Sequence, residues 1–192
     1  MENKSHPLKE LADIRQGISL SRHAAEDGEF SKPLVQNRHL EDLYIAADLE
    51  QVRLNVSDIE RYELQQNDVV VSRSFPLKAS LVNRQVAGSL AGQNIVILRP
   101  KAQIDSLYLA IVLRSQWMSD HLKKLYFGST IKMINISQLS ALEIPLPSLA
   151  TQKELAQLFL SAERAKQAAF SALETRQQIL EYILDKTLAE VL

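Results

Sequence analysis

The stretch from Gln152 to Leu192 contains neither glycine nor proline, and its apolar residues recur at alternating intervals of four and three positions. This heptad spacing is typical of a helix that packs against another helix. A helix of about 40 residues is about 60 Å long, which is too long to lie wholly on the core of a small domain. We therefore expect an exposed helix that pairs with a partner, the alternative being an ordinary core helix of the same domain. The positions expected to face the partner are Leu155, Leu158, Phe159, Ala162, Ala169, Leu173, Leu180 and Ile183.

Two prolines precede this stretch and separate it from the rest of the chain. Pro145 and Pro147 fix the backbone, remove two N–H donors and hold the chain extended, so no helix runs through them. Thr151 and Glu154 then fit the capping-box pattern [ST]-x-x-[DE] of a helix start. The expected division is a domain over residues 1–147 and a long helix over residues 148–192.

Short apolar runs in the first 147 residues predict a β-sheet. Val69–Val71 and Ile95–Leu98 consist wholly of apolar residues and predict buried strands. Leu43–Ile45 and Ala79–Val82 are shorter β candidates.

Helical patterns are interspersed with these strands. Residues Asp105–Tyr126 predict a single helix with Trp117 on its apolar side, and Val56–Glu60 predicts a short turn. The polar stretch Ser19–Arg38 predicts a long loop. Because helices and strands mix rather than alternate, the expected class is α+β, with a mixed β-sheet domain followed by one long coiled-coil helix.

Composition excludes several classes of protein. The chain has no cysteine, which excludes disulfides and thiolate metal sites. No run of about 18 apolar residues is present to cross a bilayer, and the polar segment Met1–Pro7 lacks the apolar region of a signal peptide. These features predict a cytoplasmic protein with no membrane association.

The motifs of common enzymes are also missing. The five glycines never fall into G-x-G or Walker spacing. No asparagine precedes a proline, so the Asn/Asp-Pro-Pro-aromatic signature of adenine methyltransferases is absent. The four histidines are isolated from one another and form no metal-ligand pair. We therefore expect a binding module without cofactor or metal rather than an enzyme.

The net charge of −1 conceals an uneven distribution along the chain. Residues 1–65 carry 8 lysines and arginines against 13 aspartates and glutamates, a balance of −5. Residues 66–132 carry 9 against 3, a balance of +6. Such a block is expected where one face meets an anion such as DNA, although scattered solvated charges would give the same count.

Cations and hydroxyls gather in two predicted loops of this block, with a weaker pair of candidates in an earlier loop. Arg73 is the expected base reader, because its planar guanidinium can bond O6 and N7 of guanine together. The candidate DNA contacts are Arg73, Lys78 and Arg84 after the valine strand, Ser129, Thr130 and Lys132 after the predicted helix, and Gln16 and Ser19 in the first loop.

Three segments resemble the target-recognition domain of type I restriction-modification specificity subunits. They run from Leu64 to Arg73, from Ala91 to Pro100 and from Gly128 to Gln152. The last is the most specific, because its two prolines, Leu149 and Gln152 recur in that family where the recognition domain meets a long helix. The resemblance extends from about Leu8 to Leu192, but residues 77–91 lack the glycine-rich turn that many relatives carry.

The resemblance implies a non-catalytic subunit that places methyltransferase, and possibly restriction nuclease, subunits on double-stranded DNA. Family members usually carry two domain-plus-helix units in one chain, and their helices pair as an antiparallel coiled coil. Each unit reads one half of a split site. The present chain has one unit, so the resemblance implies a half-length subunit that forms a homodimer through its C-terminal helix.

Two other functions are compatible with the sequence. One is a scaffold protein whose coiled coil binds another protein and whose globular head is structural. The other is a detached recognition domain of a restriction enzyme whose catalytic domain lies on another polypeptide. The sequence leaves the target sequence, the spacer and the choice between self-pairing and pairing with another specificity subunit open.

Overall fold

A computed structural model describes residues 4–25, 27–125 and 133–191. It divides the chain into two compact units, one ending at Lys153 and the other beginning at Glu154. Ser129, Thr130 and Lys132 lie outside the described residues. Within the described ranges, no helix is both long enough and apolar enough to cross a membrane.

The first unit contains three small sheets, so the α+β class is confirmed. The largest is antiparallel, in the order β2 (Ala12–Gln16), β8 (Ile95–Pro100), β5 (Val69–Ser72) and β6 (Ala79–Leu81). The second is mixed, in the order β4 (Gln51–Leu54), β3 (Phe30–Val35) and β7 (Leu90–Ala91), with β3 and β7 parallel. The third pairs β1 (Ser5–Pro7) with β9 (Glu143–Pro145).

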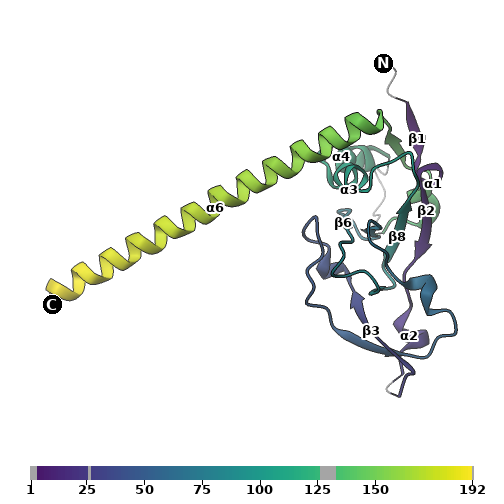
Figure 1. The fold of residues 1–192 in the computed structure, drawn as a ribbon, viewed down its shortest axis with the longest axis horizontal. Coiled ribbons are helices and arrows are strands. Elements are labelled where there is room, and N and C mark those ends of the chain that lie inside the picture. Colours follow the sequence, from purple (N-terminus) through teal and green to yellow (C-terminus); the bar gives the residue numbers. More distant parts are fainter. Residues whose placement is uncertain (1–3, 26, 126–132, 192) are drawn as a thin grey trace. The chain divides into compact units, whose positions relative to one another are not determined.

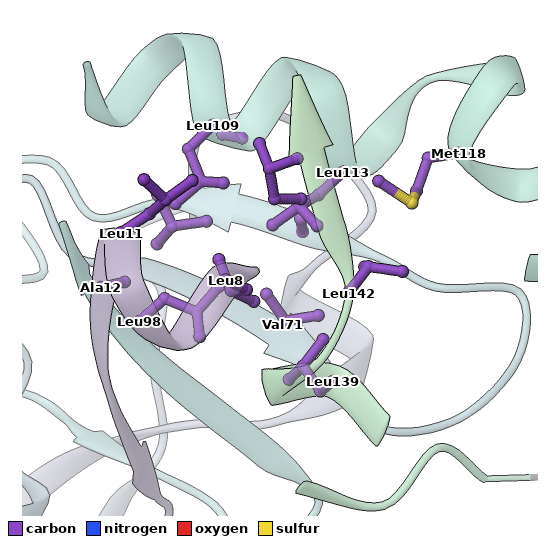
Figure 2. Close-up of a cluster of buried hydrophobic side chains, with 14 of the residues drawn as sticks. Leu8, Leu11, Ala12, Val71, Leu98, Leu109, Leu113, Met118, Leu139 and Leu142 are labelled. Carbon is purple, nitrogen blue, oxygen red and sulfur yellow. The ribbon is translucent and has the colours of Figure 1, made fainter. Parts of the chain in front are cut away.

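Helices cover one face of the four-stranded sheet (Figure 1). They are α1 (Leu8–Leu11), α3 (Ser106–Arg114), α4 (Gln116–Leu125) and α5 (Ile136–Ser140). Figure 2 shows leucines of these helices gathered over Val71 and Leu98 of the sheet. Burying a leucine or valine side chain stabilises the fold by about 1.5–3 kcal/mol.

The opposite face of the same sheet is buried as well. Val70, Ile95 and Ile97 point into a second cluster with Val35 of β3 and Ala91 of β7. Because successive strand residues point to opposite faces, a sheet that is covered on both sides needs apolar residues at every position. This explains the unbroken runs Val69–Val71 and Ile95–Leu98, whose assignment as buried strands is confirmed.

The end of the sheet near Asp68 is fixed by an ion pair. The guanidinium of Arg99 donates from Nε and from its second terminal nitrogen to the two carboxylate oxygens of Asp68, both at 2.9 Å. Asp68 is 1% exposed and also accepts the N–H of Gln65 at 2.8 Å. The hydrogen bonds that Arg99 donates to Asp68 raise the pKa of Arg99 above its ordinary value, so this cation stays charged and is paired with the buried carboxylate.

The predicted helix over residues 105–126 is wrong, because two helices occupy this range. Ser115 interrupts them, its hydroxyl donating to the carbonyl of Val112 at 2.6 Å and accepting the N–H of Met118 at 3.1 Å. The break also turns Trp117 outward. Its ring is 51% exposed and stacks on His121 with centroids 5.2 Å apart, so it does not line the core as predicted.

Two further local predictions are wrong. The stretch Ser19–Arg38 is not a continuous loop, because it contains α2 (Leu20–His23), β3 and the start of the 3-10 turn η1 (Asn37–His39). β3 tolerates Pro33 near the end of its pairing with β4. Leu43–Ile45 forms no strand and contributes only an isolated bridge between Tyr44 and Leu81.

The turn predicted at Val56–Glu60 lies slightly later, as the 3-10 turn η2 (Ile59–Tyr62).

The long helix α6 runs unbroken from Leu149 to Val191. It begins earlier than the capping pattern at Thr151 predicted, because the Ser148 hydroxyl accepts the N–H of Thr151 at 3.2 Å. Gln152 is fully buried in the first turn and ties it to the domain. Its Oε1 accepts the N–H of Asp105 at 2.8 Å, and its Nε2 donates to the carbonyls of Pro147 at 2.9 Å and Gln103 at 3.2 Å.

Candidate nucleic-acid interface

Several loops meet at one end of the four-stranded sheet, which we term the loop end. In the strand register, Gln16 lies opposite Val96, Ser72 opposite Ile95, and Val71 opposite Ala79. The loop after β2, the loop from β5 to β6 and the turn before β8 therefore leave the sheet at the same end. The chain separates these segments by up to about 80 positions, and the sheet brings them together.

The turn Gly92–Ile95 forms the centre of the loop end and is fixed by backbone hydrogen bonds. The N–H of Ile95 donates to the Gly92 carbonyl at 3.0 Å, which closes the turn, and the N–H of Gly92 donates to the Val35 carbonyl at 2.8 Å. The N–H of Gly17 donates to the Ile95 carbonyl, and the N–H of Arg73 to the Asn94 carbonyl, each at 2.9 Å. The turn is thus held from three sides by β3, the β2 loop and the β5–β6 loop.

Gly17 is required by the close approach of two backbones. A Cβ atom at this position would lie 2.0 Å from the carbonyl oxygen of Gly92 and 2.6 Å from that of Ala91. No side chain fits there unless the turn before β8 moves. The glycine therefore determines where Gln93 and Asn94 are presented.

Two open depressions flank this turn, and Gln93 lines both. The first has a volume of about 440 Å³ and the second of about 210 Å³. Amides and guanidiniums line both depressions, together with the apolar side chains of Leu20, Leu34 and Ile95 in the first. Amides and guanidiniums are the groups that bond base edges and phosphates of duplex DNA. The polar lining of the first comprises Gln36, Asn37, Arg38, Gln93 and Asn94, and that of the second Gln16, Ser19, Arg22, His23, Arg61, Tyr62 and Gln93.

The cations of the two depressions differ in their surroundings. In the first depression, a terminal guanidinium nitrogen of Arg38 lies 2.6 Å from Glu50 Oε1, so the charge of Arg38 is partly neutralised. Arg22 and Arg61 in the second are exposed and form no ion pair with any carboxylate of the described residues. The guanidinium of Arg61 lies 5.9 Å from the centre of the Tyr62 ring. These two arginines are available to an external anion.

His39 supports the wall of the first depression from behind. Its Nδ1 accepts the N–H of Gln36 at 3.1 Å, which closes the turn η1. Burial lowers the pKa of His39 below its ordinary value of 6.5, and the nearby charge of Arg38 lowers it further, against opposing effects of Glu50 and Asp48. Burial and the Arg38 charge thus favour the neutral form of the imidazole.

This shift predicts a loss of stability in acid. A histidine whose folded pKa is depressed contributes stability that is present above the unfolded pKa of about 6.5 and is lost as the pH falls through the folded pKa, because the unfolded chain binds the proton more readily. We expect the thermal midpoint to fall more between pH 7.5 and pH 5.5 in the parent than in His39→Gln. An equal decrease in both proteins would contradict this role of His39.

The loop end contains some of the residues that the sequence predicted as DNA contacts. Gln16 and Ser19 both line the second depression. Arg73 lies in the β5–β6 loop, half-buried, with its Nε donating to the Ile134 carbonyl at 3.2 Å. Lys78 lies in the same loop and forms an ion pair with Glu41.

Arg84 does not join this group, so its predicted clustering with Arg73 and Lys78 is wrong. It follows β6, which runs away from the loop end, and the adjacent Val82 carbonyl accepts the N–H of Asn67 in the turn that enters β5. Arg84 is therefore at the opposite end of the sheet.

The basic block is not a single face. Lys78, Arg99, Lys101 and Lys123 each lie within 4.0 Å of a carboxylate oxygen. Arg114 donates instead to the carbonyls of Ala79 at 2.8 Å and Glu41 at 2.7 Å. Two of these ion pairs, Lys78 with Glu41 and Lys101 with Asp13, use carboxylates from outside residues 66–132, so they offset two of the six excess positive charges.

Sequence reasoning missed Arg22, Arg61, Gln93 and Asn94. The first two belong to the acidic part of the chain, where a charge count gives no signal. Gln93 and Asn94 lie between two apolar strands and carry no charge, so nothing in the sequence marked them as candidate contacts. Among the described residues no group of three or more histidines, aspartates and glutamates is arranged to hold a metal ion.

The chain matches a known family and several solved structures. The model of the type I restriction modification DNA specificity domain matches residues 2–179. The HsdS subunit from Thermoanaerobacter tengcongensis superposes with a TM-score of 0.60 at 18% identity, over 86% of this chain and 38% of that one. The S subunit of a type I restriction-modification system from M. genitalium gives 0.53 at 20% identity, over 86% and 40%.

A third structure comes from work on complex assembly and conformational transition of the type I R-M system. It gives a TM-score of 0.57 at 21% identity, over 87% of this chain and 39% of that one. The chain thus spans about two-fifths of the length of these structures, and at these identities the likeness shows a shared fold. None of the curated proteins matches the chain.

Proposed function

Because the chain belongs to the family of type I restriction modification DNA specificity domains, we propose that it reads one half of a split DNA site through the loop end of its sheet. Specificity subunits of this family are non-catalytic. The observation that carries the proposal is the pair of amide- and guanidinium-lined depressions on either side of Gln93. The proposed contacts are Gln16, Ser19, Arg22, Arg61, Arg73, Gln93 and Asn94, and Lys78, Ser129, Thr130 and Lys132 remain proposed contacts from the sequence.

The long helix supports a second part of the proposal, that two copies pair through α6 and that the pair places a methyltransferase subunit, and a nuclease subunit where one exists, on DNA. The predicted partner-facing residues Leu158, Leu173 and Leu180 are 68%, 59% and 67% exposed in the single chain. Leaving such side chains in water is unfavourable, and a partner helix would cover them.

Near the end of α6, exposed apolar side chains surround more of the helix than a single partner helix would cover. Tyr182, Ile183 and Leu184 are all more than half exposed, and successive helix residues point roughly 100° apart. One partner helix covers a single stripe of such a surface, so this breadth supports contact with a further protein besides the second copy. It equally favours the alternative of a scaffold protein that binds only protein partners.

A DNA titration over a range of salt concentrations separates the two functions. A protein that binds phosphates loses affinity steeply as salt rises, whereas a scaffold shows no such dependence. We expect Arg22→Ala and Arg61→Ala each to reduce the log–log salt slope by about one unit.

Lys101→Ala is the matched control, because Lys101 follows β8 at the opposite end of the sheet. This variant removes one positive charge, as the arginine variants do, and should leave the log–log salt slope unchanged. Equal slopes for the parent and both arginine variants would remove the second depression from the DNA interface.

A further inference from the structure

We infer that Gln93 reads an adenine and that Ser19 positions it for this task. This inference rests on the proposed DNA-binding function and adds to it a base, a reading residue and a positioning residue. Gln93 is exposed at the second position of the Gly92–Ile95 turn. It is the residue common to the linings of both depressions.

The backbone of Gln93 is preorganised. The turn carries hydrogen bonds from Gly17, Arg73 and Ile95 and donates one to Val35, each between 2.8 and 3.0 Å. The contact between Gly17 and Gly92 leaves no space for displacement toward β2. A side chain on such a rigid base loses less conformational entropy on binding than one on a loose loop.

The side chain of Gln93 is oriented by a hydrogen bond from the Ser19 hydroxyl. Ser19 precedes α2 at the helix-cap position, yet its hydroxyl makes no capping bond to that helix. It donates to Gln93 Oε1 at 3.1 Å, across 74 positions of sequence, and it lies 3.1 Å from the Ser21 hydroxyl, which can donate to it. The bond holds the amide while leaving the second lone pair of Oε1 and both hydrogens of Nε2 for a ligand.

The free groups of this amide match one base edge. In the major groove, adenine offers a donor at N6 and an acceptor at N7, and a glutamine amide bonds both at once. Guanine offers two acceptors there, which suit a guanidinium instead. The neighbouring Arg22 and Arg61 of the second depression suit phosphates beside the base that is read.

The test uses the 192-residue chain and the duplex that it enriches from a random pool. Each adenine of that duplex is replaced in turn by 7-deazaadenine, which keeps base pairing but lacks the N7 acceptor. We expect one position in each half-site at which this change lowers affinity about tenfold. In Gln93→Ala the same replacement should have no effect, because the amide that would sense N7 is gone.

Variants at two other positions distinguish reading from general damage. Ser19→Ala should reduce the 7-deazaadenine effect, and Ser19→Thr, which keeps a hydroxyl, should restore it. Gln66→Ala, an exposed glutamine in the turn that enters β5, should behave as the parent. Salt-dependent binding in which no adenine responds, or a response that persists in Gln93→Ala, would overturn this inference while leaving the proposed function intact. Absence of salt-dependent binding by the parent would instead overturn the proposed function.

Discussion

Replacing Leu173 or Leu180 by aspartate is expected to convert the proposed dimer into monomers. Both side chains belong to the four-three stripe of α6 and are more than half exposed in the single chain. Each substitution places a charge in a seam that the dimer would bury, twice per dimer. The cost is several kcal/mol, so the dissociation constant should rise by more than about a hundredfold.

The measurement is sedimentation or light scattering over a concentration series. Gln178→Asp is the matched control, because it adds the same charge at an exposed α6 position outside the stripe. The first unit should stay folded in all variants, since its core clusters contain neither leucine. A parent chain that remains monomeric at tens of micromolar, without an added partner, would contradict the homodimer.

The polar residues within the stripe favour an antiparallel arrangement of the proposed pair. In a parallel coil, Lys166 and Arg176 would each meet their own copy, placing like charges together. An antiparallel pair offsets them and lets carboxylates such as Glu174 of the partner helix approach. Within one chain, Lys166 already lies 3.8 Å from Glu163. The small residues Ala162 and Ala169 would let the two helix backbones approach closely, and two-fold pairing buries each patch against its equivalent.

Gly17→Ala is expected to displace Gln93, the residue proposed to read a base. The new Cβ would overlap the Gly92 carbonyl oxygen, at 2.0 Å, so the turn before β8 must shift. Overpacking of this kind costs about 1–3 kcal/mol of stability. Because the shift moves Gln93 itself, DNA affinity should fall at least tenfold even at a temperature where the variant is fully folded.

Gly88→Ala provides the control for general destabilisation. Gly88 has φ +86° with open space around its Cβ position, so alanine there strains the backbone by roughly 1–2 kcal/mol without touching the turn. Both variants should lower the thermal midpoint, but only Gly17→Ala should weaken DNA binding. Parent-like affinity in folded Gly17→Ala would show that the position of this turn does not matter for binding.

The sequence predicted the fold best where burial restricts which residue types a position can hold. Val69–Val71 and Ile95–Leu98 have to be apolar at every position because both faces of their sheet are covered, and the proline pair has to interrupt the helix. The break at Ser115 was missed, because a serine side chain bonds the backbone only when geometry allows and its presence alone does not end a helix.

The candidate interface was less predictable for a different reason. Gln16, Arg61 and Gln93 come from three distant segments, and only strand register shows that they meet. The charge balance favoured residues 66–132, but Lys78 and Arg99 of this segment are paired with carboxylates of the same chain. The free arginines lie in the segment whose count was acidic. Local patterns therefore predicted the scaffold better than the surface that it presents.

Selection of duplexes from a random pool by the 192-residue chain tests whether this protein reads a split DNA site as a two-fold dimer. A two-fold dimer with one recognition domain per copy should enrich two inverted copies of one short sequence at a fixed spacing. Binding to that duplex should weaken steeply as salt rises. Recovery of a pool without sequence enrichment, with affinity that salt does not change, would contradict the account.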